Sequence, residues 1–199
     1  MKKTVLTLMI GILLMGCVKT ENPFFETYKN KYGAPPFDKI KNEHYLPAFQ
    51  KGITEQSAEV TAIAESKDAP TFDNTIAALD FSGVLLKKVS SVFFNLYSCN
   101  TNDGMEKIAT EISPVLSEHN DNIYLNEKLF ARVKTVFDNR EKLGLTHEQL
   151  RLLEKFHRNF IRSGAGLNPE QKVKLRAINK ELGLAQLAFG KNVLDETNS

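Results

Sequence analysis

The strongest constraint on the fold is the helical spacing of apolar residues, which begins near Asn42 and continues almost to the end of the chain. Apolar side chains recur three, four or seven positions apart, which places them on one face of an α-helix. No segment alternates apolar and polar residues for long enough to predict a strand. The pattern therefore predicts an all-α fold of helices packed on helices. The first stretch shows it at Leu46, Phe49, Ile53, Val60 and Ile63.

Proline and threonine predict where the first two helices begin. Pro47 is tolerated only in the first turn of a helix, so the first helix is expected to begin close to Tyr45. Thr71 stands before a first turn that contains an acidic residue, and it is therefore a suitable N-cap. A second long helix is expected to follow over residues 72–97.

Shorter helices are expected in the middle of the chain. The first covers residues 105–116, where Pro114 should end or kink it, and the next covers residues 123–137. Thr146 with Gln149 three positions later fits a capping box, which predicts that another helix begins there.

The final helix and the segment before the first helix complete the predicted organisation. Asn168 and Pro169 suit the N-cap and first position of a last helix that runs almost to Ser199. Residues 42–199 are therefore expected to form one helical region. Residues 17–41, rich in polar residues, proline and glycine, are expected to be a tether and an extended strap whose aromatic side chains dock on that region.

The first residues have the features of an export signal. Residues 1–3 carry two lysines, and residues 5–15 form an apolar run too short for a membrane span. Residues 14–17, Leu-Met-Gly-Cys, resemble the lipobox of bacterial lipoproteins. We therefore expect a signal peptide over residues 1–16 and a lipid attached to Cys17, which would anchor the exported protein to a bacterial membrane facing the periplasm or the cell exterior. The alternative is an ordinary signal peptide with an incidental cysteine.

The number of cysteines and the net charge of the mature chain limit the bonds and partners that the protein is expected to have. With Cys17 attached to lipid, only Cys99 remains, and no internal disulfide can form. Removal of Lys2 and Lys3 with the signal leaves 24 basic residues against 24 acidic ones. A neutral mature chain gives no indication of a nucleic-acid partner.

One motif has part of the pattern of a zinc site. His147 and Glu148 would begin a His-Glu-x-x-His helix, which needs a second imidazole four residues on, but that position is Arg151. His157 lies ten residues from His147, about 15 Å along a helix, which is too far to share one ion. We therefore interpret this segment as an ordinary helix start and predict no catalytic, cofactor-binding or metal-binding residue in the chain.

Three other features of the sequence contain residue types that occur in functional sites. His44 and His119 stand among polar residues and are expected to be solvated histidines. Cys99 has no histidine near it in sequence and is expected to be a half-buried structural thiol. Residues 163–166 (Ser-Gly-Ala-Gly) lack the glycine spacing, the lysine and the preceding strand of a phosphate-binding loop.

Short runs distributed along the chain carry a family resemblance. In this order and spacing they resemble the thimet oligopeptidase and neurolysin family, and residues 100–103 (Asn-Thr-Asn-Asp) favour its bacterial dipeptidyl carboxypeptidase branch. The runs are Asn22–Phe25, Ala34–Ile40, Tyr45–Ala48, Pro70–Leu79, Val92–Leu96, Asn100–Asp103, Ser163–Ala165 and Phe189–Leu194.

The resemblance implies the N-terminal helical region of a larger helical peptidase. Members of this family are zinc metallopeptidases in which two mostly helical halves enclose a channel that admits short peptides, and this branch releases dipeptides from C-termini. Their zinc is held by a His-Glu-x-x-His helix and a later glutamate, to which no residue of this chain corresponds. The resemblance therefore implies zinc and short peptide substrates for a full-length enzyme, and an inactive chain that partners the missing catalytic region.

A second class of function stays open at this point. The chain could be a non-catalytic helical lipoprotein that acts as a binding module, because its own residues contain no recognisable reaction chemistry.

Overall fold

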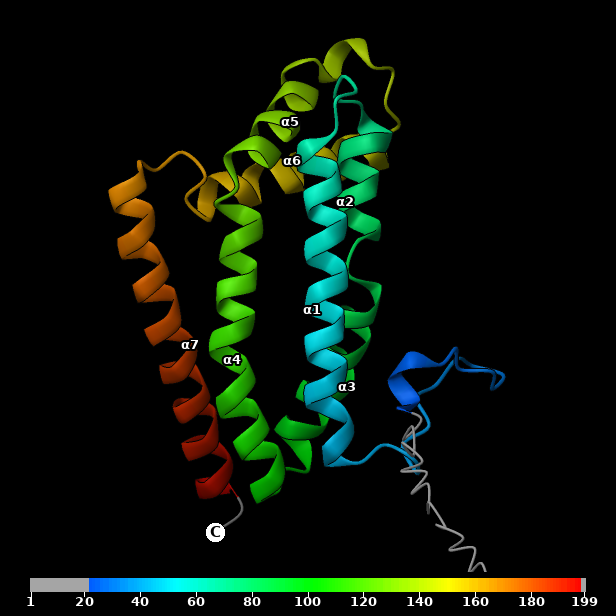
Figure 1. The fold of residues 1–199 in the computed structure, drawn as a ribbon, viewed down its shortest axis with the longest axis vertical. Coiled ribbons are helices and arrows are strands. Elements are labelled where there is room, and N and C mark those ends of the chain that lie inside the picture. The colour runs from blue at the N-terminus through cyan, green and yellow to red at the C-terminus, as the bar shows by residue number, and fades with distance from the viewer. Residues whose placement is uncertain (1–21, 198–199) are drawn as a thin grey trace, which may run out of the picture.

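The computed structural model describes residues 22–197, which contain helices and loops but no strand. Four long helices stand side by side in the order α3, α1, α4, α7 (Figure 1), because α1 packs on both α3 and α4, and α4 packs on α7. The predicted all-α class is confirmed. The four helices are α1 (Asn42–Glu65), α3 (Val84–Cys99), α4 (Asp103–Tyr124) and α7 (Pro169–Thr197).

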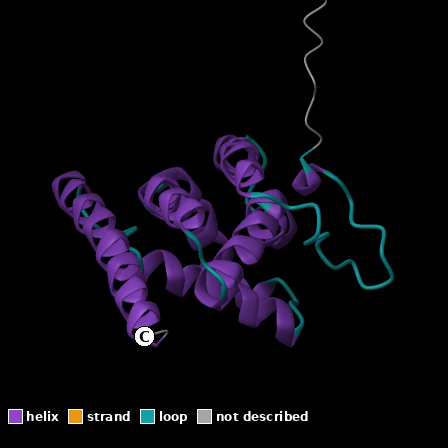
Figure 2. Ribbon diagram, turned by 90° about the horizontal axis from the view of Figure 1, so that it is seen from below, coloured by secondary structure: helices purple, strands orange, loops and turns teal. Residues whose placement is uncertain are grey.

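Two further helices lie across one end of this row. Helices α5 (Glu127–Asp138) and α6 (His147–Arg162) pack on each other, and α5 also packs on α1. Seen from below, roughly along the axes of the long helices, α7 lies at the edge of the row (Figure 2). Short elements complete the chain: the 3₁₀ turns η1 (Pro23–Phe25) and η3 (Arg140–Lys142), the π-helical turn η2 (Phe72–Ala77) and α2 (Ala78–Phe81).

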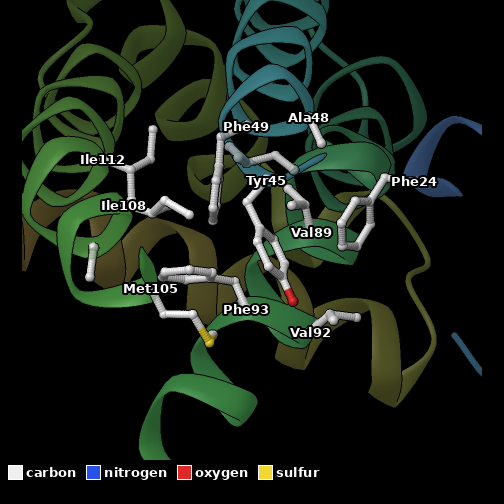
Figure 3. Packing of buried hydrophobic residues seen from close by; sticks show 12 residues of the cluster. Phe24, Tyr45, Ala48, Phe49, Val89, Val92, Phe93, Met105, Ile108 and Ile112 are labelled. Carbon is white, nitrogen blue, oxygen red and sulfur yellow. The ribbon is translucent and has the colours of Figure 1, made fainter. Parts of the chain in front are cut away.

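The buried side chains form two cores. The first lies between α1, α3 and α4, where the Phe93 ring centroid is 4.9 Å from that of Tyr45 and 5.5 Å from that of Phe49 (Figure 3). Phe24 from η1 is also fully buried there. The second core joins the far end of α1 to η2, α5 and α6, and includes Phe160. Each buried ring contributes roughly 1.5 to 3 kcal/mol to folding.

Side-chain caps position the helix starts as the sequence predicted. The Thr71 hydroxyl accepts from the amide N–H of Asn74 at 3.1 Å, and Thr146 accepts from the amide N–H of Gln149 at 3.2 Å. At α7 the Asn168 side chain accepts from a backbone N–H at 2.9 Å. A cap satisfies N–H groups that a helix end leaves without partners, and it depends only on residues near it in the chain.

The expected helix over residues 72–97 is interrupted, so that prediction was wrong. The helix is interrupted at Ser82 and Gly83. Gly83 has φ of 69°, which places it in the left-handed region that glycine adopts without strain. The break turns the chain from α2 into α3, and the Glu59 carboxylate of α1 accepts from the Gly83 N–H at 2.7 Å.

Other boundaries also differ from expectation. Helix α1 begins at Asn42, which places Pro47 in the second turn, because the His44 side chain already accepts from the backbone N–H of Lys41. Helix α4 continues through Pro114 to Tyr124, packed between α1 and α7. Helix α5 begins at Glu127, after the Asn126 cap.

The predicted signal peptide over residues 1–16 and the predicted lipid site at Cys17 lie outside the described residues. Between residues 22 and 197, no helix combines the length and the apolar character that crossing a membrane requires.

Candidate functional site

The incomplete zinc motif forms the start of α6. His147 is the first residue of this helix, and the capping box of Thr146 and Gln149 is present in both directions. Arg151, which stands where a second imidazole would be needed, lies 3.9 Å from the Glu154 carboxylate. Across residues 22–197 there is no cluster of three or more His, Cys, Asp or Glu side chains that could hold a metal ion.

His157 is a packing residue further along α6. Its ring lies parallel to that of Phe137, with centroids 3.8 Å apart, and the Arg140 guanidinium carbon is 4.4 Å from the Phe137 centroid. Burial lowers the pKa of His157, while the carboxylate of Asp138 opposes this shift. The imidazole stacked on Phe137 thus joins α6 to α5.

His44 is buried, so the prediction of a solvated side chain was wrong. Its Nδ1 accepts from the N–H of Lys41 at 3.0 Å, which closes the first turn of α1. Its backbone oxygen accepts from the side-chain amide of Asn22 at 2.8 Å. The segment before α1 folds back onto this turn, and that contact covers the imidazole.

The expectations for His119 and Cys99 were also wrong. His119 lies within α4 and is buried because that face packs against α1. Cys99, the last residue of α3, is exposed. A half-buried thiol had been expected at that position.

His119 belongs to a polar junction between α1, α4 and the break before α3. Its Nε2 lies 2.8 Å from the Gln56 side-chain oxygen, and its Nδ1 lies 3.4 Å from the Ser57 hydroxyl. The Gln56 amide donates to Ser82 Oγ at 3.3 Å, and this hydroxyl donates to the carbonyl oxygen of Leu79 at 2.8 Å. We call His119, Gln56, Ser57 and Ser82 the polar junction.

These contacts are compatible with a neutral imidazole. An amide oxygen only accepts, so the hydrogen sits on Nε2 of His119, and Nδ1 accepts from Ser57. Burial lowers the pKa of His119, which favours the same neutral form. The junction borders a half-open hollow of about 380 Å³ that Phe156 and Tyr124 also line.

A second hollow lies between α4 and α7. It has a volume of about 490 Å³ and is bordered by Pro114 and Val115 on one side and by Arg176 and Lys180 on the other. Asp121 at its edge is buried, and its carboxylate accepts from the Asn179 amide at 2.7 Å. The hollow thus combines apolar walls with charges of both signs.

Lys88 of α3 fastens the segment that precedes α1. Its ammonium donates to the carbonyl oxygens of Phe24 at 3.0 Å and Glu26 at 2.6 Å, and lies 4.1 Å from the centre of the Tyr28 ring. Burial lowers the pKa of Lys88, although the nearby charge of Glu26 opposes this effect. Residues 23–44 border a hollow of about 690 Å³.

Sequence reasoning did not find the polar junction. Gln56, Ser57 and Ser82 carry no motif, and they meet His119 only because α1 and α4 pack together. The one local signal was Gly83, which interrupts an apolar helical pattern. The polar junction can hold the helices in place. The hollows form grooves on the surface. The described residues thus define a helical scaffold with grooves.

The chain is similar in sequence to part of several known peptidases. No family model matches the chain. The chain is 42% identical over 180 residues to the dipeptidyl carboxypeptidase of Escherichia coli (strain K12), which is 90% of this chain and 26% of that protein. It is 40% identical over 173 residues to the dipeptidyl carboxypeptidase of Salmonella typhimurium (87% and 25%) and 27% identical over 161 residues to a thimet-like oligopeptidase of Dictyostelium discoideum (79% and 23%).

These similarities confirm the resemblance to the thimet oligopeptidase and neurolysin family. The identity is higher to the two dipeptidyl carboxypeptidases, at 42% and 40%, than to the thimet-like oligopeptidase, at 27%. The chain spans about a quarter of the length of the curated relatives it matches.

Proposed function

We propose that this chain is the N-terminal, channel-wall region of a zinc metallopeptidase of the dipeptidyl carboxypeptidase type, an enzyme that releases C-terminal dipeptides from short peptides. The observation that carries the proposal is the 42% identity over nine-tenths of the chain to a protein of that name. The role of the region is to hold helices and border the path of the peptide. No residue of this chain is assigned a catalytic role.

Zinc in this proposal belongs to the catalytic region of a full-length enzyme. The residues described here do not fit a zinc site, because His147 has Arg151 in place of the second imidazole and no three-ligand cluster exists between residues 22 and 197. We therefore derive no chemical step on this chain. Metal analysis of the purified chain should find no stoichiometric zinc, and one tightly held ion would contradict the assignment.

Export and lipid anchoring are part of the same proposal. Residues 1–16 are a signal peptide, residues 17–41 a tether and strap that begins at lipid-modified Cys17, and residues 42–199 the helical peptidase region. The Lys2–Lys3 pair, the apolar run and the Leu-Met-Gly-Cys sequence support this division. The enzyme would then act on peptides in the periplasm or outside the cell, held on a membrane by its lipid.

A chimeric enzyme tests the proposed function. The quarter of the E. coli dipeptidyl carboxypeptidase that matches this chain is replaced by residues 22–197, and dipeptide release from an unblocked short peptide is measured. We expect zinc-dependent release, because the region supplies an equivalent wall. The control replaces the same quarter with an unrelated helical segment. A chimera that folds and binds zinc but releases no dipeptide would overturn the proposal.

The second candidate is a non-catalytic helical lipoprotein that acts as a binding module. The observation that favours it is burial, because Phe93 and Phe160 are fully covered within the described chain, as in a self-sufficient domain. The nucleotide sequence after the codon for Ser199 separates the two. An open frame that leads to His-Glu-x-x-His supports the peptidase, and a stop codon supports the module.

A further inference from the structure

The edge helix α7 presents an apolar stripe to solvent. Five apolar residues of α7 are spaced four, three, four and four positions apart, so their side chains lie within an arc of about 80° around the helix axis. The stripe that they form is roughly 22 Å long. Large members of the stripe are strongly exposed, 51% for Leu182 and 71% for Phe189. We call this stripe the α7 seam: Ile178, Leu182, Ala185, Phe189 and Val193.

The contacts of α7 with the rest of the chain are mainly polar and lie on another side. Asn179 donates to Asp121, Arg176 donates to Asn122 at 2.9 Å, and Lys191 lies 3.5 Å from Glu106. Viewed down the axis of α7, the mean direction of these three side chains lies roughly 140° from the mean direction of the seam. Leu187 is the apolar side chain that reaches the first core from this helix.

This orientation is the reverse of that found in a helix at the edge of a self-contained domain. Such a helix turns its apolar stripe to the core and its polar residues to water. Here polar residues pair with α4 while the seam faces away from the row, where α7 stands at the edge in both views (Figures 1 and 2). Exposed apolar stripes of this kind mark surfaces that another polypeptide covers.

We propose that the α7 seam is the surface on which the remainder of the peptidase docks, through an apolar helix that packs along it. The inference rests on the proposed function. Curated relatives extend over about four times the length that this chain matches, so they contain ample polypeptide to cover the seam. The spacing of the seam suits an α-helix packed nearly parallel to α7, because side chains repeated in this way fit between those of a facing helix.

Cysteine labelling tests whether the seam is covered. Single cysteines are introduced as Leu182→Cys or Phe189→Cys in the chimeric enzyme and in the mature chain. Cys99→Ser removes the native thiol from both, and Cys17→Ser removes the second one from the mature chain. Lys180→Cys is the matched control, because this exposed residue lies about half a turn away from the seam on the same helix. The rate of alkylation is measured in the native state.

We expect all three cysteines to react at similar rates in the mature chain. In the chimera, the two seam cysteines should react at least about tenfold more slowly, because docking excludes the reagent, while Lys180→Cys should change little. Seam cysteines that stay fully reactive in an active chimera would overturn the inference and leave the proposed function intact. A chimera that folds with no activity would instead remove the function on which the inference rests.

A second copy of this chain is the competing occupant. If the mature chain forms a dimer that protects Leu182→Cys, and Leu182→Ser makes it a monomer, then the seam joins two copies and the docking proposal is wrong. Size-exclusion chromatography with light scattering measures this. The substitutions are not expected to disturb folding of the mature chain, because the seam side chains are exposed there.

Discussion

His119 of α4 donates from Nε2 to the side-chain oxygen of Gln56 on α1, at a distance of 2.8 Å. The two residues stand 63 positions apart, and the same Gln56 side chain donates to Ser82 at the break before α3. One amide therefore connects three elements. Because the junction joins neighbours in the helix row, its loss is expected to weaken the packing of α4 and α3 on α1.

The first prediction concerns stability and pH. Burial lowers the pKa of His119 below its ordinary value near 6.5, so the unfolded chain takes up a proton more readily than the folded one. The free energy of unfolding should fall as the pH drops below about 6.5. His119→Leu should cost about 1 to 3 kcal/mol at pH 8, because the Gln56 oxygen loses its partner, and it should flatten the decline at lower pH.

Urea unfolding at pH 5 and pH 8 measures both effects. His147→Leu is the control, because His147 lies exposed at the start of α6, away from the junction. His157 contributes to the decline in both variants, since burial lowers its pKa as well. Parallel pH profiles for the unmodified chain and His119→Leu would show that the junction does not contribute to the pH dependence.

The second prediction separates strain from steric clash at two left-handed glycines. Gly83 has φ of 69°, and a Cβ there would lie 2.4 Å from the Gln56 side chain. Gly144 has φ of 60°, but a Cβ there would meet nothing within 4 Å. Gly144→Ala should cost about 1 kcal/mol from backbone strain alone, and Gly83→Ala should cost about 1 to 3 kcal/mol more, because it also displaces Gln56. Equal losses in thermal unfolding would mean that Gln56 moves aside freely.

The third prediction concerns a close approach of α1 and α3 at Gly52. A Cβ on Gly52 would lie 2.8 Å from the backbone nitrogen of Leu86, which cannot rotate away. Gly52→Ala should therefore separate the two helices and destabilise the chain by about 1 to 3 kcal/mol. Gly183→Ala in α7 is the matched control, since nothing lies within 4 Å of its Cβ, and it should stabilise the chain by up to about 1 kcal/mol. Chemical denaturation of the two variants should shift the midpoint in opposite directions.

Local chemistry explains which structural features could be predicted. The starts at Thr71, Thr146 and Asn168 depend on a side chain that bonds to an N–H three residues later, so the sequence alone identifies them. The break at Gly83 and the burial of His119 depend on Gln56 and Glu59, which arrive from a different helix. Such contacts leave no periodic signal in the sequence, and for that reason the polar junction was not anticipated.

The α7 seam also combines a locally determined feature with one that depends on a distant helix. Helical spacing at Ile178, Leu182 and Phe189 predicted a helix with an apolar face, which α7 has. The pattern did not indicate that this face would point away from α4, because orientation depends on which polar partners α4 offers. Asp121 pairs with Asn179 and Asn122 pairs with Arg176, across separations of 58 and 54 positions in the sequence.

The last prediction is that Cys17 carries the membrane anchor. The hypothesis rests on residues 14–17, where a small residue and a cysteine follow directly after the apolar run. A diacylglyceryl group and an N-acyl chain together supply enough buried hydrocarbon for stable attachment, at about 0.8 kcal/mol for each buried CH₂. Expressed in a bacterium with its own first residues, the chain should take up labelled palmitate and partition into detergent. Cys17→Ser should abolish both, whereas Cys99→Ser should change neither, because Cys99 lies at the end of α3. Continued membrane fractionation of Cys17→Ser would show that the chain is held by something other than a lipid on this cysteine.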